Sequence, residues 1–123
     1  MSKYRMMIVL GPNGFVSGGL GRAATVAVAD AEAIYVHSWE EIAVGWDAAH
    51  DTQAEGSHHG NMVRFMQDHG IQIVIAGHVG EGMRVVLEKM GITFVGAPSM
   101  PGKTAAMEAA RLLDEQSTAP ANP

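Results

Sequence analysis

The sequence predicts one α/β domain with a mixed five-stranded sheet and the element order β-β-β-α-β-α-β-α. Its 123 residues suit a single domain with its own hydrophobic core. In the first half, short apolar segments with two-residue periodicity alternate with glycine-rich turns. In the second half, short apolar segments alternate with segments whose apolar residues recur every three or four positions. Strands joined by turns pair antiparallel and strands joined by helices pair parallel, so this order predicts three layers with helices over the sheet.

The first half predicts three strands or more. Residues 4–10 are continuously apolar after a short charged start, and the turn sequence Gly-Pro-Asn-Gly at 11–14 ends them. A second turn-rich segment, residues 16–22, leads into a strand at 25–29. Alternating large and polar residues over 34–46 indicate one or two further strands.

The middle of the chain predicts a loop, a helix and a strand. Residues 48–60 are polar and have no periodicity, which is typical of a loop. Residues 61–69 carry apolar side chains at helical spacing, and Gly70 follows where a left-handed cap would end the helix. Residues 71–76 are apolar throughout and predict a buried strand.

The last third predicts two helices around a short strand. Met83 to Met90 is the clearest helix, because its apolar residues recur at i, i+3, i+4 and i+7 and Gly91 follows. Residues 93–95 form a strand, and 101–115 form a helix with an alanine stripe. We expect the domain to cover residues 1–115 and residues 116–123 to be a disordered tail.

Composition excludes several classes of protein. The formal net charge is −5 and the basic residues are scattered, so nucleic acid is not an expected partner. The absence of cysteine excludes disulfides and thiolate metal sites, and leaves His, Asp, Glu, Met or backbone groups as metal ligands. No apolar run approaches about 20 residues and no signal sequence begins the chain, so we expect a cytoplasmic protein with no membrane partner.

Four histidines form the best candidate metal-ligand set: His50, His58, His59 and His78. Imidazole binds zinc, copper, iron and nickel. The first three lie in the predicted loop, and the fourth follows a strand, where such turns meet at one edge of a sheet. Ordinary surface histidines and acid-base catalysis remain open alternatives.

The glycine-rich turn at 77–82 is a candidate anion site. Gly77, Gly80 and Gly82 lie between a strand and a helix, so backbone N–H groups and the helix dipole are available to phosphate, molybdate or the sulfide face of a cluster. The spacing G-x-x-G-x-G differs from that of dinucleotide-binding loops. The alternative is that these glycines serve tight turns and close packing.

Three motifs in this order resemble the dinitrogenase iron-molybdenum cofactor biosynthesis family, which includes the NifX-like proteins. They are VSGGLGRA at 16–23, a histidine-containing segment before a helix, and GHVGEGM at 77–83 after a strand. Ser17, Gly21, Arg22 and Ala23 match the family's S-x-H-F-G-R-A pattern. Gly19 stands where the family usually has histidine, and Leu20 where it has phenylalanine.

The resemblance covers about residues 4–113 and implies a ribonuclease H-like fold. It also implies a non-enzymatic carrier of an iron-molybdenum or other metal-sulfur cluster, a transition metal ion or an oxyanion, which docks with protein partners in cofactor assembly as a monomer or homodimer. The residues expected at the cofactor are Ser17, Gly21, Arg22, Gly77, Val79, Gly80 and Gly82.

Two alternatives accompany this expectation. The replacement of the family histidine by Gly19 and the lack of cysteine favour an interaction or regulatory domain that kept the fold and lost the cofactor. An enzyme acting on a small anion at the glycine-rich turn has no catalytic residues in support. The first strand lacks the carboxylates of a two-metal nuclease, and Ser17 has no elbow motif or orienting acid. We therefore expect no enzymatic activity.

Overall fold

The computed structural model describes residues 2–52 and 55–118 and contains the predicted mixed five-stranded sheet. The strands are β1 (Tyr4–Leu10), β2 (Thr25–Glu32), β3 (Tyr35–Ala43), β4 (Ile73–Ala76) and β5 (Thr93–Gly96). Their order across the sheet is β3-β2-β1-β4-β5. β1 pairs antiparallel with β2 and parallel with β4, so the turn-linked strands and the helix-linked strands meet at β1. The predicted α/β class is confirmed.

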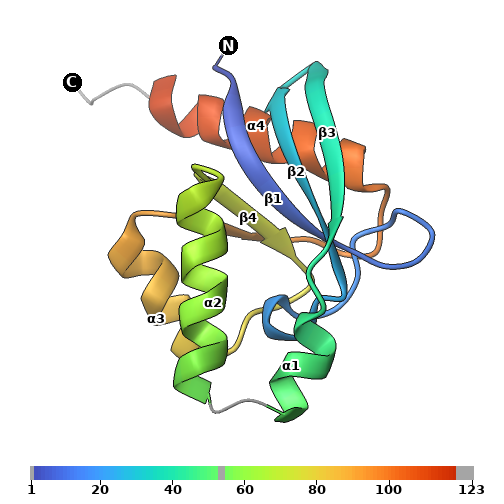
Figure 1. Cartoon of the computed structure of the whole chain (residues 1–123). Coiled ribbons are helices and arrows are strands. Elements are labelled where there is room, and N and C mark those ends of the chain that lie inside the picture. Colours follow the sequence, from blue (N-terminus) through green and yellow to red (C-terminus); the bar gives the residue numbers. More distant parts are fainter. Residues whose placement is uncertain (1, 53–54, 119–123) are drawn as a thin grey trace.

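Helices cover both faces of the sheet. They are the 3-10 helix η1 (Leu20–Arg22), α1 (Trp46–Thr52), α2 (Glu55–Asp68), α3 (Glu81–Met90) and α4 (Gly102–Thr118). α4 crosses one face, whereas α2 and α3 lie on the other (Figure 1). η1 and α1 contact each other beside the lower ends of the strands in that view. Among the described residues, no helix has the length and apolarity needed to span a membrane.

Alternation along β1 divides the core into two layers. Met6, Ile8 and Leu10 face α4, whereas Met7 and Val9 face α2 and α3. All five are buried because β1 is the central strand and both of its faces are covered. Burial on both faces of the sheet therefore explains the continuous apolar run at 4–10, as the sequence predicted.

The predicted helix ends at Gly70 and Gly91 are confirmed. Gly70 and Gly91 adopt φ angles of 63° and 73°, the left-handed conformation that ends a helix at low cost for glycine. The Gly91 N–H donates to the Glu88 carbonyl at 3.1 Å, and the following N–H of Ile92 donates to the Leu87 carbonyl at 2.9 Å. These bonds satisfy the last carbonyl groups of α3 before the chain enters β5.

The predicted loop at 48–60 is wrong, because α1 and α2 occupy most of it. Glycines at 56 and 60 lower intrinsic helix propensity by about 1 kcal/mol each, which hides the helix in the sequence. Burial of Met62 and Met66 against the sheet supplies the compensating packing. The element order therefore contains one α-helix more than predicted, in addition to η1.

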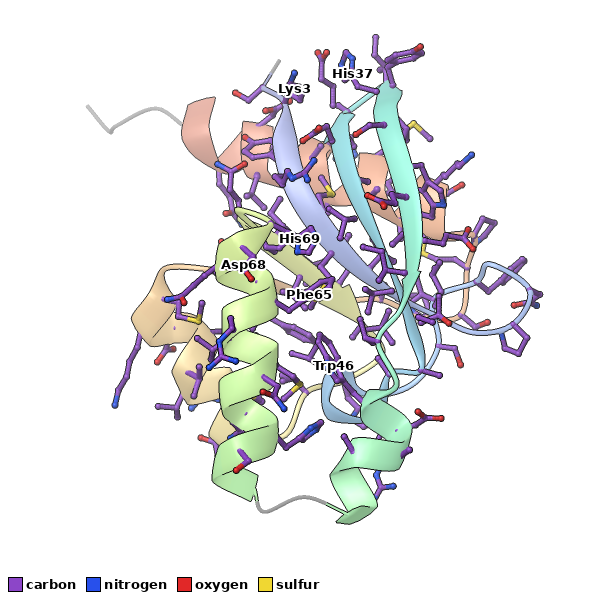
Figure 2. All side chains as sticks on the ribbon, viewed as in Figure 1. Lys3, His37, Trp46, Phe65, Asp68 and His69 are labelled. Atoms are coloured by element: carbon purple, nitrogen blue, oxygen red, sulfur yellow. The ribbon has the colours of Figure 1, made fainter. Side chains whose placement is uncertain are left out.

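The predicted strand over 34–46 is too long at its end. β3 stops at Ala43, Gly45 turns with a φ angle of 66°, and Trp46 begins α1. The Trp46 N–H donates to the Ala23 carbonyl at 2.8 Å, and its ring meets Phe65 edge to face at 5.5 Å between centroids (Figure 2). At the other end of the chain, α4 continues to Thr118, so residues 116–118 of the predicted tail are helical.

Candidate functional site

A pocket of about 260 Å³ lies where three segments far apart in the sequence meet. These are the η1 segment, the first turns of α2, and the turn from β4 into α3. The pocket is lined by Gly19, Leu20, Gly21, Arg22, His58, His59, His78, Gly80, Glu81, Gly82 and Met83. Its volume suits a ligand smaller than a drug-sized molecule, for which pockets of about 300–1,000 Å³ are usual.

Backbone hydrogen bonds hold two walls of the pocket together. The Gly77 N–H donates to the Gly18 carbonyl at 2.8 Å, and the Leu20 N–H donates to the His78 carbonyl at 3.1 Å. Gly19 and His78 are paired in the same ladder as an isolated parallel bridge. The η1 segment and the turn after β4 therefore form one continuous wall whose two parts are kept in register.

His58 ties α2 to this wall. Its side chain is buried, with 3% of its surface exposed. Nε2 lies 2.8 Å from the Gly21 carbonyl oxygen. Because a carbonyl oxygen can only accept, Nε2 carries the hydrogen, and in the neutral ring the lone pair belongs to Nδ1. His58 thus positions the η1 segment through Nε2, and its other ring nitrogen, Nδ1, is buried.

The other imidazoles are more accessible. His59 is half-buried, with its ring centroid 6.1 Å from that of His58, and His78 is exposed at the rim. Adjacent helical residues project about 100° apart, yet both His58 and His59 line the pocket. Within residues 2–52 and 55–118, no three His, Asp or Glu side chains come together as a metal-binding group.

The first turn of α3 also lines the pocket. Its N-cap, Gly80, has no capping side chain, and Glu81, Gly82 and Met83 line the pocket. The first N–H groups of a helix lack partners within the helix and carry partial positive charge, so they favour an anion. This property makes the α3 wall suited to a negatively charged ligand.

The carboxylate of Glu81 is paired on the outside of α3. Arg84 donates from Nη2 to Oε2 at 2.6 Å and from Nε to Oε1 at 3.1 Å. These hydrogen bonds, and secondarily the charge of Arg84, hold the pKa of the Glu81 carboxyl below its ordinary value. Arg84 thereby offsets the one negative charge among the side chains that line the pocket.

Seven of the predicted site residues line the pocket, three do not, and the side chain of His50 is not among the described ones. The seven are Gly21, Arg22, Gly80, Gly82, His58, His59 and His78. Ser17 lies outside it, close to where a Cβ on Gly11 would be, and Gly77 serves the backbone link to Gly18. Val79 packs against the α2 and α3 core. His50 falls in α1, and its side chain lies outside the described part of the chain.

Sequence reasoning missed Glu81, Leu20 and Met83 as pocket residues. Met83 and Leu20 are almost fully buried, so their apolar character indicates packing, and only the arrangement of the helices puts one side of each against the pocket. Glu81 follows directly from the glycine-rich turn and was detectable as the first residue of α3. Gly19 was noticed only as a departure from a family pattern.

Residues 5–114 match the family described as dinitrogenase iron-molybdenum cofactor, and the chain belongs to this family. The resemblance inferred from the three motifs is therefore confirmed. A comparison with curated proteins found no match.

Solved structures share the fold at low sequence identity. The apo form of the orange protein from Desulfovibrio gigas is 24% identical, with a TM-score of 0.64, and the match covers 92% of this chain and 89% of that chain. A candidate dinitrogenase from Methanocaldococcus jannaschii is 13% identical, with a TM-score of 0.60 and coverage of 89% and 93%. A candidate NifB protein from Thermotoga is 19% identical, with a TM-score of 0.56 and coverage of 94% and 89%. At these identities the likeness concerns the fold.

Proposed function

We propose that this protein is a non-enzymatic carrier that binds a small anionic metal-sulfur cluster or oxyanion as its cargo. The observation that carries the proposal is the convergence, in one pocket, of the Arg22 side chain, three imidazoles and the first turn of α3. Arginine and helix N-termini bind anions, and imidazole can coordinate a metal centre. Membership of the iron-molybdenum cofactor family supports a metal-sulfur cargo.

The donor set fits an anionic cargo better than a bare metal cation. A protein site for a cation needs about three or four converging ligands, and the described residues offer no such group. The chain also has no cysteine to supply thiolate. A metal-sulfur anion brings its own sulfide ligands, so it needs only hydrogen-bond donors, positive charge and one or two imidazoles from the protein.

Each wall has a distinct part in this proposal. Arg22 supplies charge-assisted hydrogen bonds from the η1 segment, and the α3 turn supplies backbone N–H groups. His59 and His78 are the accessible imidazoles, whereas His58 mainly positions the Gly21 carbonyl through its 2.8 Å bond. The role proposed for this pocket is binding and transfer of cargo.

The proposal includes several finer expectations. The fold is of the ribonuclease H type, the location is the cytoplasm, and cargo passes to protein partners in cofactor assembly, with the carrier acting as a monomer or homodimer. The alternative is an interaction domain that has lost cargo binding. It is favoured by the absence of a three-ligand metal group among the described residues.

Uptake of defined probes by the full chain tests the proposal. Equilibrium dialysis against tetrathiomolybdate, molybdate, phosphate and Ni²⁺ separates a metal-sulfide anion, an oxyanion and a cation. We expect tetrathiomolybdate to bind and Arg22→Gln to weaken it by about tenfold or more, because a hydrogen bond to a charged group contributes roughly 1.5–3 kcal/mol.

Arg64→Gln is the matched control, because Arg64 is an exposed arginine of α2 outside the pocket. The affinity of Arg64→Gln for tetrathiomolybdate is expected to equal that of the unmodified chain. Equal loss in both arginine variants would show that binding is merely a response to net charge. If none of the probes binds, the carrier function fails and the interaction domain becomes the better explanation.

A further inference from the structure

The position of the His78 ring gives a steric reason for glycine at position 19. A Cβ added to Gly19 would lie 2.4 Å from Cε1, 2.9 Å from Nδ1 and 3.0 Å from Nε2 of the His78 ring. Real Cβ atoms do not approach other atoms below 3.0 Å, so any side chain at position 19 would have to displace this ring. The ring therefore occupies the space through which a side chain at position 19 would leave the backbone.

Backbone conformation does not explain this glycine. Gly19 has φ −91° and ψ 152°, an extended conformation that any residue adopts. By contrast, the neighbouring Gly18 has a φ angle of 81°, a left-handed conformation that favours glycine. The requirement for glycine at position 19 therefore comes from the turn after β4, which carries His78.

The two backbones cannot separate to relieve such a clash. Hydrogen bonds of 2.8 Å between Gly77 and Gly18, and of 3.1 Å between Leu20 and His78, flank the contact on both sides. Gly19 itself is buried. The His78 side chain is the one part able to move, and it is exposed at the pocket rim, so a substitution at position 19 would turn the imidazole away from its present place.

We propose that Gly19 is a positioning residue for the site, because its missing side chain lets the His78 imidazole stand at the pocket and contact the cargo. A side chain at position 19 and this placement of His78 exclude each other. The claim that His78 contacts the cargo rests on the proposed carrier function, whereas the claim that Gly19 leaves room for the His78 ring does not. The cargo class is a metal-sulfide anion, whose sulfide ligands can accept a hydrogen bond from an imidazole N–H.

A double-mutant cycle on the full chain tests the role in binding. Gly19→Ala and His78→Ala are each expected to weaken tetrathiomolybdate binding by roughly tenfold, the loss expected when one hydrogen bond to a charged group is removed. Because both changes remove the same imidazole, the double variant is expected to be no weaker than His78→Ala alone. Gly60→Ala is the control, since a Cβ there meets nothing within 4 Å and the residue does not line the pocket. Additive losses in the double variant would overturn this role.

NMR of the free protein tests the steric part without any cargo. In Gly19→Ala the ring signals of His78 are expected to shift, while those of His37 and His69, which lie on other elements, stay in place. Unchanged His78 signals would overturn the inference. If the unmodified chain binds no tetrathiomolybdate, the carrier function fails, and the His78 signals still decide whether Gly19 controls the position of the ring.

Discussion

The two faces of the sheet are packed in different ways. Opposite α4, the contact is made largely by small side chains from β2 and α4, namely Ala27, Ala29, Ala31, Ala105, Ala106, Ala109 and Ala110. Opposite α2 and α3, the core contains large side chains, including Trp46, Met62, Met66, Met83 and Leu87. The α4 cluster thus includes an alanine stripe from β2 and α4, whereas the α2 and α3 cluster includes large side chains from the helices.

The candidate-site pocket lies on the α2 and α3 side of the sheet. The start of α4 is pressed onto the sheet, since a Cβ on Gly102 would lie 2.8 Å from Cδ2 of Leu10 and 3.0 Å from Cη2 of Trp39. On the other side, the first turns of α2 and α3 reach past the large core residues and meet η1 around the pocket. The core cluster under α4 therefore contributes no residue to the site pocket, whereas the α2 and α3 face combines core packing with placement of the site.

Met66→Ala is expected to have the largest effect, because it affects both stability and the site. Met66 is buried at 1% exposure on α2, so its truncation should cost about 2–5 kcal/mol of unfolding free energy. Loosening α2 should also weaken probe binding, since His58 and His59 belong to this helix. Urea unfolding and equilibrium dialysis measure the two effects. Intact binding in the folded variant would contradict the link between this face and the site.

Ala106→Leu is expected to destabilise the fold and leave the site unchanged. Ala106 lies on α4 and is fully buried against the sheet, so a larger side chain there should cost about 1–3 kcal/mol through overpacking. Thr104→Leu, at an exposed position of the same helix, is the control and should change unfolding by no more than about 0.5 kcal/mol. Below the unfolding temperature, tetrathiomolybdate should bind Ala106→Leu as it binds the unmodified chain. Weakened binding would show that both faces control the pocket.

Glu81→Gln is expected to have the smallest effect, confined to α3. Arg84 lowers the pKa of Glu81, so the carboxylate stabilises the folded chain above its unfolded pKa of about 4.3. That contribution is lost as pH falls through the lower folded value. Thermal melts should therefore show the unmodified chain slightly more stable at neutral pH, with the difference vanishing in acid. A difference that grows in acid would contradict this pairing.

The sequence was sufficient for the elements that have strong local signals. The apolar run of β1, the i, i+3, i+4, i+7 spacing of α3, and the glycine caps at 70 and 91 are each set by nearby residues. It was insufficient for α1 and the start of α2. Their polar, glycine-containing sequence has no helical periodicity, and the packing that stabilises α2 comes from residues further along the same helix, such as Met66.

By itself, the sequence determined the α/β class, the mixed sheet, the family and most of the segments that contribute to the site, because periodicity, turn residues and motifs are local properties. Only the tertiary structure decided which site residues meet. Ser17 and Val79 lie within matching motifs yet point elsewhere, whereas His58, Arg22 and Gly82 converge from three segments. The steric reason for glycine at position 19 is likewise found only in the structure, because it is a contact with His78, 59 positions away in the sequence. A contact between two loops leaves no pattern in the sequence of either one.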